Sequence, residues 1–297
     1  MMTSNHALLE SIQHGLSEAL GEISEVQWVG RLAGGDINQA ALVRSGETKF
    51  FVKYHEHAPN DMFTVEARAL AEISEQGVIR VPSPVAQGDA GRTSWLVLEH
   101  MELKAMGPAS LMGEQLAALH NIPQKRFGWA CDNYIGTTSQ TNTFHDSWAD
   151  FWSQCRLRPQ FAMAESAGFG GRLLNRGERL LQSMDQFLQG HQPAASLLHG
   201  DLWGGNQAFS VDGQPVIFDP ASYYGDRETD IAMTELFGGF EPAFYAAYRA
   251  HSPLPDGYDL RRDLYNLYHM LNHLNLFGGG YLSRCENMID RLMAQIR

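Results

Sequence analysis

The stretch that decides the fold is LLHGDLWGGNQAFSVDGQPVIFDPA, at residues 197–221. A short apolar run is followed by a polar loop and then by two strand-like runs separated by a tight turn. The turn is predicted at VDGQ, residues 211–214, because Asp-Gly readily takes the positive backbone angles that hairpin turns need. We therefore expect a hairpin that carries Asp219, at the end of its second strand, back next to Asn206.

Three polar residues of this stretch carry the chemical prediction. Asp201, Asn206 and Asp219 supply two carboxylates and one carboxamide, which can hold a divalent metal ion on a polyphosphate and place a base beside it. Together with His199 they match the H-x-D-x-x-x-x-N loop of kinases, in which a following strand ends in a metal-binding Asp. The His-Gly-Asp triplet alone is a weak signal because it also occurs by chance. The kinase interpretation therefore depends on its combination with Asn206 and Asp219 and on an upstream Lys.

A lysine and an acid upstream complete the pattern. Lys53 lies in FFVKYH, whose aromatic and β-branched residues predict a strand, and Glu66 lies in the helix predicted over about 61–75. In a kinase the Lys would contact the nucleotide phosphates and the Glu would orient it. The alternatives are an edge-strand Lys that points at water and a solvated surface acid.

Two other segments are assigned to nucleotide binding by their order in the chain. Gly34 and Gly35 lie in a turn between the first two of three predicted strands (23–33, 37–44 and 48–54), where backbone amides can approach phosphate oxygens. The turn is not a full G-x-G-x-x-G, so an ordinary hairpin turn is the alternative. Glu99 and Met101 follow the strand predicted at 94–98, where a kinase chain crosses between lobes and its backbone reads the adenine edge.

Helices are predicted over most of the remaining chain, at about 5–20, 108–120, 148–167, 172–188, 231–237 and 242–297. Residues 80–89 read as a connection, and 126–143 as irregular. His120 is interpreted as a core or capping histidine, and Asp230 as a brace for the catalytic loop. Trp148 and Trp152 are most simply core residues, although aromatic faces could also wall a substrate pocket.

Bulk composition is that of a soluble globular protein of one or two domains, with 297 residues, 44% hydrophobic and 19% charged. The formal net charge of −12 disfavours nucleic acid or an anionic membrane as partner, but a nucleotide substrate stays possible because metal can offset local charge. The start of the chain lacks the pattern of a signal peptide, and no apolar run is long enough to span a bilayer. Three widely spaced cysteines favour a reducing, cytoplasmic setting.

With these segments assigned, the chain resembles the fructosamine kinase (ketosamine-3-kinase) family. This family is similar in fold to aminoglycoside phosphotransferases and, more distantly, to protein kinases. The resemblance covers nearly the whole chain, and its most specific part is HGDLWGGN with the segment that follows Asp219. The segments that carry it are GGDIN (34–38), FVK (51–53), FTVEARAL (63–70), FGWACDNYIGTTSQTN (127–142), RLRPQ (156–160), HGDLWGGN (199–206) and DPASYYGDRETDIAMTELFGGF (219–240).

The resemblance implies an α+β, two-lobed, protein-kinase-like fold. A small β-rich nucleotide-binding lobe would cover 1–102 and a larger, mostly helical catalytic and substrate-binding lobe 103–297. It also implies transfer of the ATP γ-phosphoryl group to the 3-hydroxyl of a ketosamine, a sugar joined to an amine. The phosphorylated product is unstable and releases the amine, so the family is read as acting in protein deglycation.

Residue roles follow from the same resemblance. Asp201 would be the catalytic base, Asn206 and Asp219 would ligate Mg²⁺, and Lys53, oriented by Glu66, would hold the α- and β-phosphates. Trp203 lies two residues past the proposed base, so its indole is expected to line the acceptor side of the cleft, and a Trp packed under the loop as core is the alternative. Asp226 and Glu228, in the loop after the metal-binding Asp, are also assigned to substrate binding. Some relatives carry Cys where this chain has Asp36, so redox control by a disulfide at that turn is not expected.

Two alternatives remain open from the sequence. A related kinase acting on an aminoglycoside, choline or homoserine would keep the same Lys, Asp, Asn and Asp and differ in its acceptor pocket. The Trp203-Gly204-Gly205 insert favours the ketosamine interpretation. A non-catalytic kinase-fold binding module would lack at least one catalytic group, and each expected group is present in this sequence.

Overall fold

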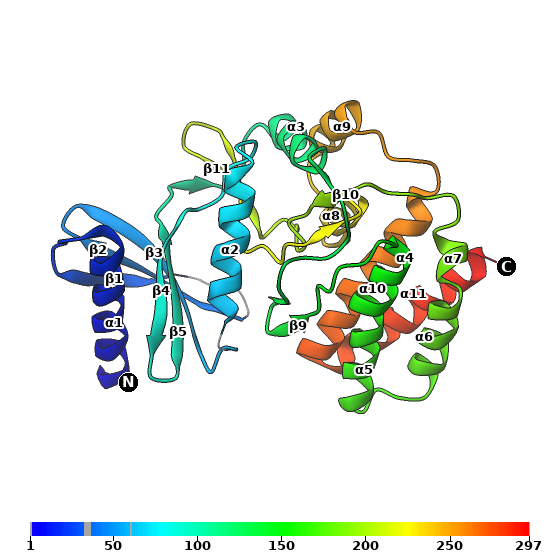
Figure 1. Ribbon diagram of the computed structural model, residues 1–297, viewed down its shortest axis with the longest axis horizontal. Helices are drawn as coiled ribbons and strands as arrows, with labels where there is room; N and C mark the ends of the chain where they lie inside the picture. Colours follow the sequence, from blue (N-terminus) through cyan, green and yellow to red (C-terminus); the bar gives the residue numbers. More distant parts are fainter. Residues whose placement is uncertain (1, 33–36, 60, 297) are drawn as a thin grey trace. The chain divides into compact units, whose positions relative to one another are not determined.

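The computed structural model describes residues 2–32, 37–59 and 61–296. The chain forms two compact units (Figure 1). The N-terminal unit comprises residues 1–107 and 208–219, and the C-terminal unit comprises 108–207 and 220–297. The predicted division near residue 102 treated the lobes as consecutive pieces of chain, whereas the segment 208–219 returns to the N-terminal unit.

The N-terminal unit is built on a five-stranded sheet of order β1-β2-β3-β5-β4. Each pair of neighbouring strands is antiparallel, which is the arrangement expected of a kinase-like lobe and not of a parallel nucleotide-binding sheet. The strands are β1 Val26–Leu32, β2 Gln39–Ser45, β3 Thr48–Glu56, β4 Pro84–Ala90 and β5 Thr93–Glu99.

Strand β4 corrects the expectation that residues 80–89 are only a connection. The prolines of this segment argued against a strand because proline cannot donate a ladder hydrogen bond. Pro84 is nevertheless the first residue of β4, and β4 is the edge strand beside β5. At that position a missing N–H costs little, so proline is tolerated.

Helices α1 (Met2–Leu20) and α2 (Met62–Glu75) cover opposite faces of this sheet (Figure 1). Helix α1 places Leu8, Ile12 and Leu16 in a core with Val52 and other side chains of the sheet. Neighbouring side chains of a strand point to opposite faces, so Lys53 points to the α2 side. Each fully buried aliphatic side chain of this core stabilises the unit by about 1.5–3 kcal/mol.

The predicted hairpin is present and belongs to the N-terminal unit. Strand β11 (Gln207–Ser210) pairs with β6 (Leu103–Lys104), and β12 (Pro215–Ile217) lies on the other side of β11. Gly213 has φ of +82° and donates its N–H to the Ser210 carbonyl over 2.9 Å, which confirms the Asp-Gly turn. The Ile217 N–H donates to the Arg80 carbonyl over 3.0 Å. This hairpin delivers Asp219 to the N-terminal unit.

The C-terminal unit is mostly helical, as the sequence predicts, and α10 runs through its centre (Figure 1). Leu264, Leu267, Leu271 and Leu274, which repeat at helical spacing along α10, are buried. The helices are α3 Ala109–His120, α4 Trp148–Phe151, α5 Arg158–Ser166, α6 Arg172–Gln182, α7 Met184–Phe187, α8 Glu228–Leu236, α9 Pro242–His251, α10 Tyr258–Phe277 and α11 Leu282–Gln295. Short strands connect them: β7 Pro123–Gln124, β8 Asn133–Ile135, β9 Thr138–Gln140, β10 Ala195–Leu197 and β13 Tyr224–Gly225.

The helix predicted to start at Trp148 is interrupted by a π-helix at Trp152–Leu157. The side chain of Arg156 is completely buried there, with its guanidinium 3.9 Å from the ring centre of Tyr223. It donates to the Thr141 carbonyl and to Asn142 Oδ1, each over 2.7 Å. The π-turn thus presents a cation to polar groups inside the unit. Trp148 and Trp152 are buried, which confirms them as core residues.

Two further observations concern the whole chain. Within the described ranges, no helix combines the length and the apolar character that crossing a membrane requires. Cys131, Cys155 and Cys285 are free thiols.

Candidate active site

The loop after β10 is held in place by a buried aspartate. Asp230, in the first turn of α8, accepts the N–H of His199 over 2.7 Å and the N–H of Gly200 over 2.8 Å. Burial alone would raise the pKa of Asp230, but the hydrogen bond and charge of His120 and the loop contacts outweigh it and lower that pKa. An ionised Asp230 therefore fixes the loop backbone, which confirms its predicted bracing role. His120 is buried and contacts Asp230 and the Tyr248 hydroxyl, as expected of a core histidine.

Gly200 is the residue that this loop geometry requires. Its φ is +85°, in the left-handed region that favours glycine, and a Cβ there would collide with the Ala221 carbonyl. The Ala221 N–H donates to the His199 carbonyl over 2.8 Å, so the two segments are in direct backbone contact. The glycine of the His-Gly-Asp triplet therefore lets the loop pass close to the segment that follows Asp219.

Asp201 projects from this loop with a partly exposed side chain. The amide of Asn206, a neutral donor, and the ring of His199 lie next to it in the loop. Asn206 Nδ2 donates to the Asp201 carbonyl over 2.8 Å and approaches Oδ2 at 3.3 Å, and the Asp201 N–H donates to His199 Nδ1 over 3.2 Å. A carboxylate held by neutral donors keeps more of its basicity than one paired with a cation. With its Nδ2 used in this way, Asn206 has Oδ1 left as a ligand atom.

The N-terminal unit contains the predicted lysine–acid pair. Lys53 Nζ donates to Glu66 Oε1 over 2.6 Å and to Asp219 Oδ1 over 3.0 Å. Lys53 is 4% exposed, and its burial would lower the pKa of the ammonium. The charges of Asp219 and Glu66 outweigh burial and raise that pKa. Burial raises the pKa of the Glu66 carboxyl, and Lys53 opposes that shift.

Asp219 has an uncommon backbone conformation for a residue other than glycine. Its φ is +59°, and such residues concentrate at functional sites because the strain, of order 1–3 kcal/mol, must be offset by surrounding structure. Its side chain is 45% exposed while Oδ1 contacts Lys53, so the carboxylate is held in place and still reaches solvent. This is the combination that a ligand to a metal ion needs.

The oxygens of Asn206 and Asp219 fit a hard cation such as Mg²⁺, which prefers carboxylate and carbonyl oxygen ligands. Asn206 belongs to the C-terminal unit and Asp219 to the N-terminal unit. Their use by a single ion stays a prediction.

Trp203 lies on the surface of the C-terminal unit and not in its core. Its side chain is 40% exposed, and its ring meets Phe237 edge-on at 6.2 Å between ring centres. A Cβ at Gly205 would collide with the indole, which explains the glycine beside it. The ring of His273 contacts those of Phe237, Phe277 and Tyr281, with 5.0–5.5 Å between the ring centres of each pair. Trp203 therefore lies at one end of a group of aromatic side chains.

Asp226 and Glu228 lie in a buried ionic cluster instead. Both are 1% exposed. Asp226 Oδ2 contacts His191 Nε2 and accepts from the Tyr265 hydroxyl, each at 2.6 Å. Glu228 accepts two hydrogen bonds from Arg261, over 2.6 and 2.8 Å, although burial raises the pKa of its carboxyl. His191, Asp226 and Glu228 are spaced closely enough to hold a metal ion, but the Arg261 guanidinium already supplies a cation to this cluster.

The remaining predicted site residues are those assigned to nucleotide binding at the glycine turn and after β5. Gly34 and Gly35, with Asp36, lie outside the described residues. Glu99 ends β5, and its carboxylate accepts the Ser83 N–H over 2.9 Å and approaches Arg80 at 3.8 Å. Met101 follows in the segment between β5 and β6. The adenine contact of these two residues stays a prediction.

Sequence reasoning missed a buried polar network next to the segment that follows Asp219. Gln140 Nε2 donates to the Ala221 carbonyl over 3.1 Å and to Asn133 Oδ1 over 2.8 Å, while Asn133 Nδ2 donates to the Ser222 carbonyl over 2.8 Å. The signal was the density of Asn, Gln and Thr in residues 127–142, which read only as irregular. His269 of α10 was also missed, and its Nδ1 lies 3.9 Å from Asp201 Oδ1.

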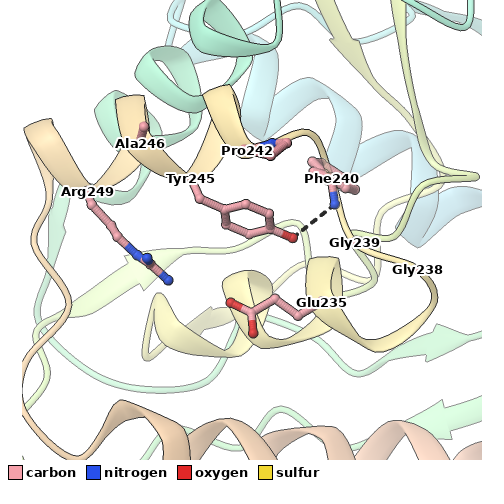
Figure 2. A pocket seen from close by; sticks show the side chains of 8 residues that line it. All are labelled: Glu235, Gly238, Gly239, Phe240, Pro242, Tyr245, Ala246 and Arg249. Carbon is pink, nitrogen blue, oxygen red and sulfur yellow. Dashed lines mark hydrogen bonds between the residues drawn. The ribbon is translucent and has the colours of Figure 1, made fainter.

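A separate cavity in the C-terminal unit lies between α8 and α9 and is lined by Glu235, Phe240, Tyr245 and Arg249 (Figure 2). The Tyr245 hydroxyl points to the Phe240 N–H and accepts from it over 3.0 Å. The lining contains none of the predicted site residues that the structure describes.

Comparison with known proteins identifies the family. The fructosamine kinase family model matches residues 8–295. A probable ketoamine kinase of Synechocystis is 42% identical over 99% of both chains, and a chloroplastic protein-ribulosamine 3-kinase of Arabidopsis thaliana is 36% identical over 93% of this chain and 86% of its own.

Solved structures agree with this result. A fructosamine-3-kinase candidate from Haemophilus somnus superposes with a TM-score of 0.87 at 30% identity, covering 98% of this chain and 99% of its own. An aminoglycoside phosphotransferase, at 14% identity and a TM-score of 0.61, shares the fold. The chain therefore belongs to the fructosamine kinase family and is a phosphotransferase with the two-lobed, kinase-like α+β fold.

Proposed function

We propose that this enzyme transfers the γ-phosphoryl group of ATP to the 3-hydroxyl of a ketosamine. The observation that carries the proposal is the buried Lys53 ammonium, held by Glu66 and by the strained, partly exposed Asp219. An ammonium fixed in this way is suited to the α- and β-phosphates of a nucleotide. Membership of the fructosamine kinase family supports the acceptor class.

In the proposed step, Asp201 orients the sugar hydroxyl and accepts its proton. The hydroxyl oxygen forms a new bond to the γ-phosphorus, and the bond between that phosphorus and the β–γ bridging oxygen breaks to release ADP. Asn206 supports this role because it holds the Asp201 main chain and approaches Oδ2 without bringing a positive charge. The protein mainly positions the reactants, since phosphoryl transfer asks for little covalent chemistry from it.

Asn206 and Asp219 would hold Mg²⁺ in the complex with ATP. The ion would neutralise charge on the phosphates when bound. The hydrogen bond from Lys53 orients the Asp219 carboxylate, so this proposed metal-ligating group is in position before the nucleotide binds. This arrangement reduces the ordering that nucleotide binding must impose on the site.

On the acceptor side, Trp203 is the residue that we propose contacts the ketosamine. An exposed indole can stack on a sugar ring or attract a protonated secondary amine. Asp226 and Glu228 are proposed to have a structural role instead, because their oxygens are buried and bound to His191, Tyr265 and Arg261. The formal net charge of −12 suits a cationic amine better than nucleic acid or an anionic membrane.

The test is ADP release by the purified chain in the presence of ATP and Mg²⁺ with a panel of acceptors. The panel contains fructosamine, ribulosamine and erythrulosamine derivatives of lysine, together with an aminoglycoside, choline and homoserine. We expect ADP release to depend on one or more of the ketosamines. Stimulation by one of the other acceptors alone would replace this proposal by a related small-molecule kinase. No acceptor-dependent release with any of them would favour a binding module.

A further inference from the structure

His269 is a buried histidine in the middle of α10, next to the proposed base, and none of the contacts described for the kinase pattern uses it. It is 4% exposed, and its Nδ1 is completely buried without a hydrogen-bond partner among the described residues. A buried polar atom without a partner costs about 1–3 kcal/mol, so such atoms need an explanation. The nearest carboxylate oxygen to this Nδ1 is Oδ1 of Asp201, at 3.9 Å.

The surroundings of His269 keep its imidazole neutral. Burial, as the largest cause, and the nearby His273 and Arg156 lower the pKa of His269 to about 3, although Asp230 opposes this shift. A neutral imidazole carries one N–H, and a carboxylate favours the tautomer in which that N–H lies on the facing nitrogen. His269 can therefore donate to Asp201 without adding a positive charge that would weaken it as a base.

The two oxygens of Asp201 thus face two different neutral donors. Asn206 Nδ2 lies 3.3 Å from Oδ2, and His269 Nδ1 lies 3.9 Å from Oδ1. Both distances are longer than a hydrogen bond of 2.7–3.2 Å, but hydrogen bonds in catalytic sites often tighten only when substrate binds. The hydrogen bond requires Asp201 Oδ1 to turn towards the imidazole, whose ring packs edge-on against Tyr268 with 5.3 Å between ring centres.

We propose that His269 is a positioning residue for phosphoryl transfer: its neutral Nδ1–H donates to Asp201 Oδ1 and holds the carboxylate in the orientation that receives the sugar proton. This inference rests on the proposed kinase function. It explains the buried Nδ1, because the missing partner is supplied once Asp201 turns towards it. His269 acts through Asp201 and does not itself contact the reacting atoms.

The test compares three substitutions of His269, two of which place a neutral amide at different positions. In His269→Asn the amide nitrogen can occupy the position of Nδ1, whereas in His269→Gln it extends to the position of Nε2. His269→Leu removes the donor. For each variant, kcat with the best ketosamine, KM for ATP, KM for the ketosamine and the melting temperature are measured.

We expect His269→Leu and His269→Gln to lower kcat by about 10- to 100-fold, the size expected for losing one hydrogen bond to a charged group. KM for ATP stays at the wild-type value, and His269→Asn restores most of kcat. Asn and Gln variants that lose kcat equally at matched melting temperatures would overturn the inference, and so would three variants that all keep full kcat. A wild-type enzyme inactive towards every ketosamine would refute the proposed function itself, which is a separate result.

Discussion

The Lys53 cluster of the N-terminal unit and the Asp201 loop of the C-terminal unit place their carboxylates in opposite electrostatic settings. In the first, two carboxylates share one buried ammonium through hydrogen bonds of 2.6 and 3.0 Å. In the second, the neutral side chains of Asn206 and His269 approach the oxygens of the Asp201 carboxylate at longer distances, 3.3 and 3.9 Å. The first region thus holds its carboxylates beside a cation, whereas Asp201 is approached by the neutral side chains of Asn206 and His269.

The difference follows from what each carboxylate is proposed to do. A group that holds a cation is best fixed and ionised before the ligand arrives, and a neighbouring ammonium achieves both. A group that takes a proton must keep its basicity, which a cation beside it would reduce. We therefore expect that substituting one residue of the Lys53 cluster affects stability and ATP affinity, whereas substituting one residue of the Asp201 loop affects mainly kcat.

The largest expected effect is that of Asp201→Asn. The amide keeps the size of the side chain but cannot accept the proton, so kcat falls by about 10²–10⁴-fold. Binding of ATP, measured by calorimetry, stays at the wild-type level because the Lys53 cluster is intact. Activity of Asp201→Asn close to wild type would show that another group is the base.

In the N-terminal unit, Lys53→Met is expected to act on stability as well as on activity. The substitution leaves Glu66 and Asp219 without their common cation, and breaking a buried ion pair in this way costs about 3–5 kcal/mol, less here because Asp219 is half-exposed. Chemical denaturation measures the loss.

The matched control is the double variant Lys53→Met/Glu66→Gln, which removes both buried charges. It should regain stability relative to Lys53→Met but not ATP affinity. If the double variant is no more stable than the single one, the lost stability does not come from an unpaired Glu66.

His269 predicts a pH dependence of stability in the C-terminal unit. Its pKa in the folded protein is lowered to about 3, whereas the unfolded chain takes up the proton near the usual 6.5. Between these two pKa values the unfolded state binds more protons than the folded state. The contribution of His269 to the free energy of unfolding is therefore complete above pH 6.5 and declines as pH falls, by roughly 2 kcal/mol at pH 5. Urea unfolding at pH 7, 6 and 5 should show a steeper decline for wild type than for His269→Asn. Parallel declines would mean that His269 titrates normally.

The smallest expected effect is that of Trp203→Ala. Losing an exposed indole that contacts a sugar or an ammonium costs about 0.5–2 kcal/mol, so KM for the ketosamine rises by roughly 2- to 30-fold while KM for ATP is unchanged. Trp203→Phe, which keeps an aromatic face, should lie in between. A simultaneous loss of affinity for ATP and ketosamine would assign Trp203 a structural role.

Local patterns allowed much of the fold to be predicted. Aromatic and β-branched runs and turn residues indicated β1–β3 and the Asp-Gly hairpin, and the helical pattern of the last third of the chain included α10, because these features depend on neighbours in the chain. The Lys53–Glu66 pair was predicted as well, since it joins consecutive elements of a recurring layout. The edge strand β4 was missed because its first residue, Pro84, is one that strands usually avoid.

What the sequence could not reveal depends on burial and on contacts between distant residues. Asp226 and Glu228 were expected at the substrate, but side chains distant in the chain bind them in the interior: His191 and Tyr265 contact Asp226, and Arg261 pairs with Glu228. The π-helix at Trp152–Leu157 was also missed: Pro159, just after it, lacks the N–H of a regular helix, but the register also depends on the partners of the Arg156 guanidinium, which lie elsewhere in the chain. His269 looks like any apolar-face histidine until the fold brings it to Asp201.

The most direct test of the account is where the phosphoryl group ends up. After incubation of the enzyme with ATP, Mg²⁺ and a fructosamine derivative of lysine, phosphorus–proton correlation NMR identifies the sugar carbon that carries the phosphate. The account predicts one new phosphomonoester, coupled to the proton on carbon 3 of the sugar, whose amount together with that of the released lysine equals the ADP formed, and which is absent with Asp201→Asn. A phosphate on any other position, or ADP formed with neither a phosphorylated sugar nor released lysine, would contradict it.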